Sequence, residues 1–76
     1  MNSYITGAVI KRLREKEKLT QAELAAKINV SAKAVSKWET GKGLPYISLI
    51  EPLASALKVS VMELMSGDEV TNSNRS

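Results

Sequence analysis

Residues 19–41 read LTQAELAAKINVSAKAVSKWETG, a pattern that predicts two short helices joined by a tight turn. Only Asn29, Val30 and Ser31 separate the two helical stretches. A turn this tight needs one residue at positive φ, and asparagine tolerates that conformation better than any residue type except glycine. The small side chain of Ala25 lets the second helix cross closely over the first. The segment is therefore predicted to form a helix-turn-helix.

Capping boxes mark the expected helix starts along the chain. In this S/T-x-x-E pattern the hydroxyl accepts a hydrogen bond from a free backbone N–H and the carboxylate reaches back to the capping residue. The pattern occurs three times, at Thr20 with Glu23, at Ser48 with Glu51 and at Ser60 with Glu63. Ser31 marks a further helix start, although Ala34 stands where the acid would be.

Apolar spacing and these caps predict an all-α fold of five helices with no strand. The first helix is expected at about 4–17, with Ile5, Val9, Ile10 and Leu13 on one face. The others are expected at about 21–28, 32–40, 49–57 and 61–66, with Gly41 and Gly67 ending the third and the fifth. Residues 68–76 are polar and without pattern, so we expect one domain over residues 1–67 and a frayed tail or linker over 68–76.

The composition excludes several classes of chemistry. With 76 residues the chain is one small domain, and it contains neither Cys nor His. Zinc sites lose their usual ligands, and histidine bases and serine triads are excluded, so we expect no enzyme, no metal and no cofactor. No apolar run is long enough for a membrane span or a signal peptide, which favours a cytoplasmic binding domain.

Charge is distributed unevenly along the sequence. Residues 1–44 carry nine basic and four acidic side chains, a net of +5, whereas residues 45–76 carry two basic and four acidic, a net of −2. A basic half and an acidic half favour an oriented approach to a polyanion. The alternative is that these are the solvated charges of ordinary helix surfaces.

The sequence resembles the phage-repressor/Cro-type helix-turn-helix proteins, the XRE family, over about residues 5–67. The resemblance rests on Leu13-Arg14, Leu19-Thr20-Gln21, Glu23-Leu24-Ala25, Val30-Ser31, Val35-Ser36-Lys37-Trp38-Glu39, Gly41, Pro45, Leu53-Ala54, Leu57, Val59-Ser60 and Glu63-Leu64. It implies a prokaryotic or phage protein with a compact five-helix, lambda-repressor-like domain. Such a domain places residues 32–40 in the DNA major groove, usually as a homodimer on a two-fold operator. Lys18 departs from the family, because many members have Gly after the first helix.

The third expected helix has two distinct sides. Val35 and Trp38 lie three residues apart and are expected to face the core. The opposite stripe, which we call the outer stripe, consists of Ala32, Lys33, Ser36, Lys37 and Thr40. Lysine can donate to guanine O6 and N7, and alanine can contact a thymine methyl group. Matched to the family, the base-reading residues are Ala32, Lys33, Lys37 and Ser36. The alternative is that the lysines contact phosphates or only solvate the helix.

Further residues are expected to position the domain. The resemblance implies that Gln21, Thr40 and Lys42 contact DNA phosphates; the alternatives are a solvated helix start and ordinary C-cap roles. It also implies that Arg14 and Glu39 bridge the first helix and the end of the third, which would align the recognition helix. The alternative is a pair of exposed ions.

The last helix divides its apolar residues between two stripes. Val61 and Leu64 are expected to face the core, whereas Met62 and Met65 lie on a neighbouring stripe. Methionine adapts well at contacts, so Met62 and Met65, with Leu44, Tyr46 or Ile47, form a candidate dimer surface. The alternative is that the methionines belong to the core.

Together these patterns predict a sequence-specific double-stranded DNA-binding transcriptional regulator, most simply a repressor, located in the cytoplasm and associated with the nucleoid. The alternative is a protein-interaction module of the same fold, such as an antitoxin or an adaptor. That reading predicts salt-tolerant binding through apolar residues and little affinity for DNA.

Overall fold

The computed structural model describes residues 7–66, and over that range its regular structure consists of helices joined by turns and loops, with no strand. The elements are α1 (Gly7–Lys16), α2 (Gln21–Lys27), α3 (Ala32–Glu39), the 3₁₀ turn η1 (Ile47–Leu49), α4 (Ile50–Ala56) and α5 (Val61–Ser66). The predicted all-α class and the five helices are confirmed. Residues 4–6 of the first expected helix, Gly67 and the expected tail at 68–76 lie outside the described residues.

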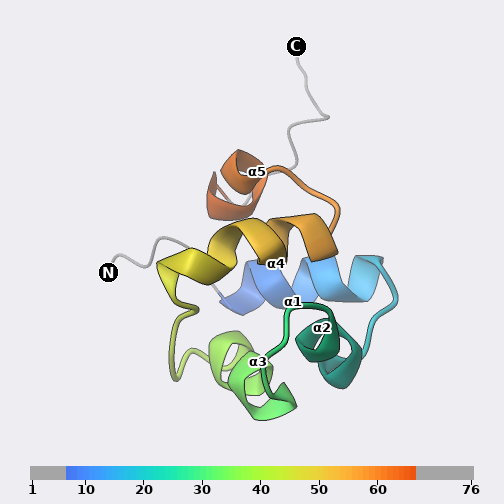
Figure 1. Ribbon diagram of the computed structural model, residues 1–76, viewed down its shortest axis with the longest axis vertical. Coiled ribbons are helices and arrows are strands. Elements are labelled where there is room, and N and C mark those ends of the chain that lie inside the picture. The colour runs from blue at the N-terminus through green and yellow to red at the C-terminus, as the bar shows by residue number, and fades with distance from the viewer. Residues whose placement is uncertain (1–6, 67–76) are drawn as a thin grey trace.

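Figure 1 shows how these helices are arranged. The helices α2 and α3 occupy one end of the molecule, α1 and α4 cross the middle of the view, and α5 lies at the other end. Twelve buried apolar residues from all five helices and their junctions form one core, which includes Leu13, Leu24, Val35, Leu53 and Leu64. Because α3 contributes only one of its sides to this core, its other side is left at the surface.

Three of the predicted helix starts have the expected caps. The Glu23 N–H donates to the Thr20 hydroxyl at 3.0 Å, and the Thr20 N–H donates to the Glu23 carboxylate at 2.8 Å. Ser60 and Glu63 make the same reciprocal pair before α5. At the start of α3 the Ser31 hydroxyl accepts from the Ala34 N–H at 3.1 Å. Each cap satisfies a donor that the first helical turn leaves free.

The predicted capping box at Ser48 is wrong. Ser48 lies inside η1, and α4 starts two residues later with Leu49 as its N-cap and no side-chain cap bond. A residue whose side chain caps a helix has extended backbone, as Thr20 and Ser31 do, whereas Ser48 is already within a turn closed by the bond from the Leu49 N–H to the Tyr46 carbonyl, 2.8 Å long. The local signal is therefore overridden by an extra helical turn ahead of α4.

Four helix ends share one hydrogen-bond pattern. After α1, the Lys18 N–H donates to the Glu15 carbonyl at 2.9 Å and the Leu19 N–H donates to the Arg14 carbonyl at 3.1 Å. This is the Schellman arrangement, in which the residue after the helix adopts positive φ. Among residues 7–66 those with positive φ are Lys18 (60°), Asn29 (62°), Lys58 (62°) and Gly41 (78°). The predictions for Asn29 and Gly41 are confirmed, and Lys18 adopts the same positive-φ conformation.

The predicted core assignment of Val61 is wrong. Its side chain is 37% exposed, whereas Leu64 in the same helix is fully buried. Helix α5 has only six residues and reaches the core through one side, so the first residue of the helix lies at the rim of the packed surface. Met62 and Met65 are 73% and 40% exposed, so neither belongs to the core of the single chain.

Candidate nucleic-acid interface

Helix α3 presents a buried side and an exposed side. Val35 is fully buried and Trp38 is only 6% exposed, so both anchor the helix in the core. On the outer stripe, Ala32, Lys33, Lys37 and Thr40 are exposed and Ser36 is half-buried. The structure thus brings all the predicted base-reading residues to one accessible side of α3. Their contacts with bases stay a prediction.

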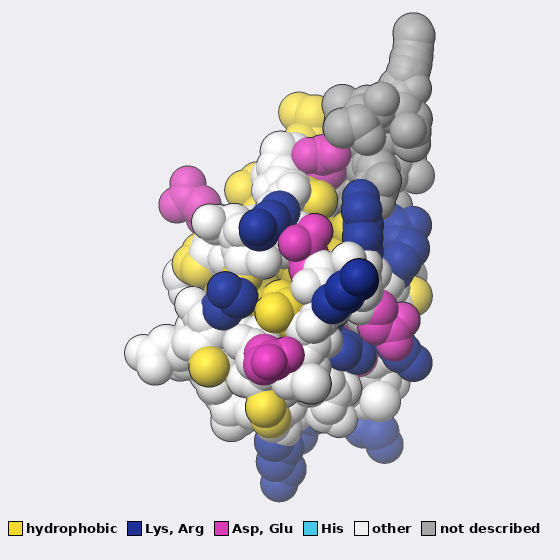
Figure 2. Space-filling view, turned by 90° about the vertical axis from the view of Figure 1, so that its right-hand side faces the viewer, with side chains coloured by type: hydrophobic (Ala, Val, Ile, Leu, Met, Phe, Trp, Pro, Cys, Tyr) yellow, Lys and Arg dark blue, Asp and Glu magenta, His cyan; other side chains and the backbone are white. Residues whose placement is uncertain are grey.

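This exposed side is positively charged. It carries Lys33 and Lys37, and Lys42 follows just beyond the helix. Within residues 7–66 none of these three lysines has an ion-pair partner. Lysine and arginine side chains project from the lower end of the molecule in Figure 2, the end that α2 and α3 occupy in Figure 1. Unpaired cations on an exposed helix attract polyanions and are free to bind them.

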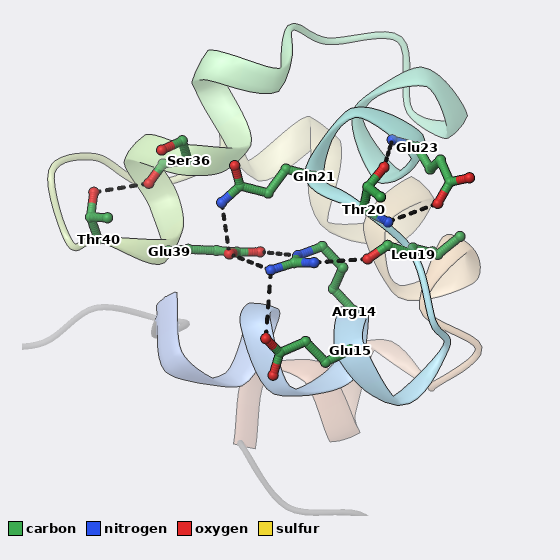
Figure 3. A network of polar contacts seen from close by, with 9 residues as sticks. All are labelled: Arg14, Glu15, Leu19, Thr20, Gln21, Glu23, Ser36, Glu39 and Thr40. Carbon is green, nitrogen blue, oxygen red and sulfur yellow. Dashed lines mark hydrogen bonds and ion pairs between the residues drawn. The ribbon is translucent and has the colours of Figure 1, made fainter.

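A buried polar network fixes the position of α3 relative to α1 and α2 (Figure 3). The Arg14 Nε donates to Glu39 Oε2 at 2.7 Å, and Arg14 Nη2 donates to Glu39 Oε1 at 3.0 Å. A third bond runs from Arg14 Nη1 to the Leu19 carbonyl at 2.8 Å. The Arg14 and Glu39 side chains are only 11% and 3% exposed. The two-pronged geometry fixes direction as well as distance, so it holds the end of α3 at one angle to α1.

The network also changes the acidity of its members. Burial by itself would raise the pKa of Glu39, but hydrogen bonds from Arg14 and Gln21 and the charges of Arg14 and Lys11 outweigh it. The pKa of Glu39 therefore lies below its ordinary value. The hydrogen bond to Glu39 raises the pKa of Arg14 above its ordinary value. Both groups stay charged at neutral pH, which keeps the ion pair intact.

The predicted phosphate-contacting residues differ in how free their donors are. Gln21 Nε2 donates to Glu39 Oε1 at 3.0 Å, so this side chain joins the network and ties the start of α2 to the end of α3. An amide group has two N–H donors, which leaves one for a phosphate oxygen. The Thr40 hydroxyl donates to the Ser36 carbonyl at 2.8 Å, as its alternative C-cap role requires. Because phosphate oxygens only accept, Thr40 would have to turn its hydroxyl to contact one. The phosphate contacts stay predictions.

Two features of this region have only faint signals in the sequence. Gly7 lies where the start of α1 meets the end of α3, and a Cβ there would come within 2.8 Å of the Glu39 Cα. The bond between Gln21 and Glu39 joins residues 18 positions apart. A glycine at a helix start suggests a close approach, but only the packed structure identifies the neighbour.

Helices α2 and α3 form a helix-turn-helix, and α3 exposes a basic side. This fold and this surface define a DNA-binding helix-turn-helix domain. The chain belongs to the helix-turn-helix family, whose profile matches residues 10–64. No helix among residues 7–66 is both long and apolar enough to cross a membrane.

Known relatives include regulators from bacteria, fungi and phages. The transcriptional activator BcrR of Enterococcus faecalis is 39% identical over 61 residues, covering 80% of this chain and 30% of BcrR. Multiprotein-bridging factor 1 of Candida albicans is 36% identical over 55 residues, covering 72% of this chain and 36% of the factor. The chain thus spans about a third of the length of these relatives. The crystal structure of the phage P22 c2 repressor in complex with a synthetic operator matches with a TM-score of 0.77 at 34% identity. That match covers 84% of this chain and 97% of the repressor chain.

Proposed function

We propose that this protein is a sequence-specific double-stranded DNA-binding transcriptional regulator, most simply a repressor that acts by occupying a promoter. The observation that carries the proposal is the outer stripe of α3, which is exposed and carries unpaired lysines while the other side of the helix is buried. Similarity to an operator-bound phage repressor supports it.

In this proposal α3 enters the major groove. Lys33 and Lys37 donate to guanine O6 and N7, Ala32 contacts a thymine methyl group, and Ser36 bonds either kind of base edge. Gln21, Thr40 and Lys42 bind phosphates on either side and fix the register without reading sequence. Arg14 and Glu39 are positioning residues, because their ion pair sets the angle at which the stripe meets the groove.

The proposal includes a homodimer on a two-fold operator. Met62 is 73% exposed, and the exposed Met65 and Val61 lie beside it on α5. Methionine side chains adapt to a partner surface at low cost, and clustered exposed apolar residues mark contact sites. The two-fold operator of such a homodimer would have half-sites about one helical turn apart.

The proposed regulator works by binding alone, in the cytoplasm and on the nucleoid. It needs no metal or cofactor and catalyses no reaction, in keeping with the DNA-binding regulators among its relatives.

Selection of bound sequences from random duplex DNA, followed by titrations over a salt series, tests the proposal. We expect a two-fold consensus, and a salt dependence whose log–log slope falls by about 0.9 for each phosphate contact removed. Lys33→Gln and Lys37→Gln should alter the preferred bases. Lys58→Gln is the matched control, since it removes the same charge away from α3. Unchanged affinity and preference in the two α3 variants would show that α3 does not read the groove.

One observation favours a second candidate function, a protein-interaction module. Exposed apolar residues on α5 and on η1 are suited to contact a partner, and one relative bears the name multiprotein-bridging factor. This function predicts no selected DNA sequence and a partner whose binding is insensitive to salt. A Met62→Glu, Met65→Glu variant should abolish that binding and leave any DNA affinity of the monomer unchanged.

A further inference from the structure

A groove of about 360 Å³ lies beside α3, on the flank that faces the loop before η1. Its walls are mainly apolar and include Ala34, Trp38, Leu44 and Tyr46. The rim is basic, because Lys37 and Lys42 also line the groove. No acidic residue lines it, and residues 40–50 contain none.

The path of the loop explains why the groove stays open. Gly41 adopts a φ of 78°, and the Lys42 N–H donates back to the Lys37 carbonyl at 2.8 Å, so the chain turns sharply away from the end of α3. Pro45 is then fully buried and anchors the loop, whereas Leu44 and Tyr46 on either side are 46% and 80% exposed. These two side chains border the groove instead of filling it.

The shape and charge of the groove specify the chemistry of an occupant. Apolar surface left in water costs about 25 cal/mol per Å², so an apolar body that covers the walls gains free energy. An anionic group on the same molecule gains from the two lysines at the rim. Small-molecule pockets range from about 300 to 1,000 Å³, so this volume suits one compact ligand. A docked helix would need anchor sites spread over several turns.

The groove shares two residues with the proposed DNA interface. Lys37 belongs to the outer stripe, and its Cβ lies 4.0 Å from the position of a Cβ on Gly43 at the groove wall. Lys42 is one of the proposed phosphate-binding residues. An anion held in the groove would therefore occupy cations that DNA also needs. By linkage, the factor by which the anion lowers the affinity for DNA is also the factor by which DNA lowers the affinity for the anion.

We propose that this groove binds a compact organic anion, an aromatic or short aliphatic body with one acidic group, and that the anion and DNA exclude each other. The exclusion rests on the proposed DNA-binding function, whereas the binding of the anion does not. Such a ligand would release the regulator from DNA.

Two fluorescent probes with the same apolar body test the binding. The first is 8-anilinonaphthalene-1-sulfonate, and the second is N-phenyl-1-naphthylamine, which lacks the sulfonate. Trp38 is the only tryptophan in the chain and lines the groove, so its emission reports occupancy directly. We expect one saturable site for the sulfonate probe, a change in Trp38 emission, and weaker binding of the neutral probe.

Variants assign the site. Lys42→Gln should lower the affinity for the sulfonate probe about two- to fivefold, as expected for the loss of one partly exposed ion pair. The affinity for the neutral probe should not change. Ala34→Leu narrows the groove and should lower the affinity for both probes. Circular dichroism checks that this variant keeps its helical fold. Lys58→Gln is the matched control for Lys42→Gln, since it removes the same charge outside the groove. Sulfonate affinity that is unchanged in both Lys42→Gln and Ala34→Leu, or that falls as much in Lys58→Gln, would overturn the proposal.

A competition experiment separates the two proposals. Addition of a selected DNA duplex to the complex of the protein with the sulfonate probe should release the probe. Trp38 emission should then equal that of the DNA-bound protein without probe. DNA that binds without releasing the probe would show that the exclusion is wrong. Failure of every duplex to bind would contradict the proposed function. The probe titrations without DNA would still show whether the groove binds an organic anion.

Discussion

The two ends of this small domain are built on different principles. Both ends have a reciprocal cap, Thr20 with Glu23 before α2 and Ser60 with Glu63 before α5. At the end that holds α2 and α3 a nearly buried ion pair also fixes the backbone, and exposed lysines lie on the surface. At the α5 end a six-residue helix is anchored by Leu64 and leaves Met62 and Met65 exposed. Polar bonds set direction, whereas apolar surfaces adapt to what covers them. The first end is thus suited to reading a rigid ligand at a fixed angle, and the second to association.

Removal of one partner of the ion pair should have the largest effect on stability. Glu39→Gln leaves the Arg14 charge with little solvent access, so the free energy of unfolding should fall by about 3 kcal/mol. Glu15→Gln is the matched control at the same arginine, because the Glu15 carboxylate is 3.9 Å away and 58% exposed. It should cost less than about 1 kcal/mol. Urea unfolding measures both, and equal losses would contradict the special role of Glu39.

The same ion pair predicts a pH dependence. The pKa of Glu39 is lower in the folded protein than the ordinary value of 4.5, so the carboxylate contributes fully to stability above pH 4.5. That contribution is lost as the pH falls through the folded pKa. The difference in unfolding free energy between wild type and Glu39→Gln should therefore shrink on acidification from pH 5 to 3. A constant difference over that interval would show that Glu39 is not the titrating group.

The close approach of α1 and α3 should be the next most sensitive feature. In Gly7→Ala the new Cβ meets the backbone of Trp38 and Glu39, which cannot move as a side chain can. We expect a loss of about 2 kcal/mol, typical of overpacking. Gly43→Ala is the control, because its Cβ would meet only the Lys37 Cβ, at an ordinary contact distance of 4.0 Å and without positive φ, and it should cost nothing. Thermal unfolding of both variants measures the contrast; an equally stable Gly7→Ala would mean that the two helices can separate freely.

Substitution at the helix ends should stabilise the protein. Lys18 and Lys58 hold positive φ, so Lys18→Gly and Lys58→Gly each relieve about 1 kcal/mol of backbone strain. Ala26→Gly, at an exposed position within α2, should instead cost about 0.5–1 kcal/mol. Chemical denaturation distinguishes the two signs. Destabilisation by all three changes would show that the lysine side chains themselves hold these turns.

The smallest effect on the folded monomer is expected at the α5 end. Met62→Gln removes apolar surface that is already in water, so the free energy of unfolding should change by less than about 0.5 kcal/mol. Sedimentation equilibrium should nevertheless show weaker self-association. Dimerisation that is unaffected by this change would place the proposed interface elsewhere.

Structural features whose cause lies within one helical turn could be predicted from the sequence. Thr20 with Glu23, Asn29 and Gly41 each have their structural consequence within a few residues, and each was predicted correctly. Ser48 fails because the preceding residues form a 3₁₀ turn, which a pattern of four residues does not register. Helical spacing alone placed Val61 in the core, but the limited contact surface of α5 leaves it at the rim.

Features that depend on distant residues were accessible only through resemblance or not at all. The ion pair of Arg14 and Glu39 joins residues 25 positions apart and was expected only because the family implies it. The participation of Gln21 in that network was not predicted. Positive φ at Lys58 was also missed, although Val59 after it packs against the core, as the residue after a Schellman turn often does.

The central claim is that the outer stripe of α3 meets DNA while α5 does not. Titration of a ¹⁵N-labelled sample with a selected duplex tests it most directly, through the amide chemical shifts. We predict the largest shifts at Ala32, Lys33, Ser36 and Lys37, with further shifts at Gln21 and Lys42 where phosphates bind. Largest shifts at Val61–Met65, with α3 unchanged, would contradict the account.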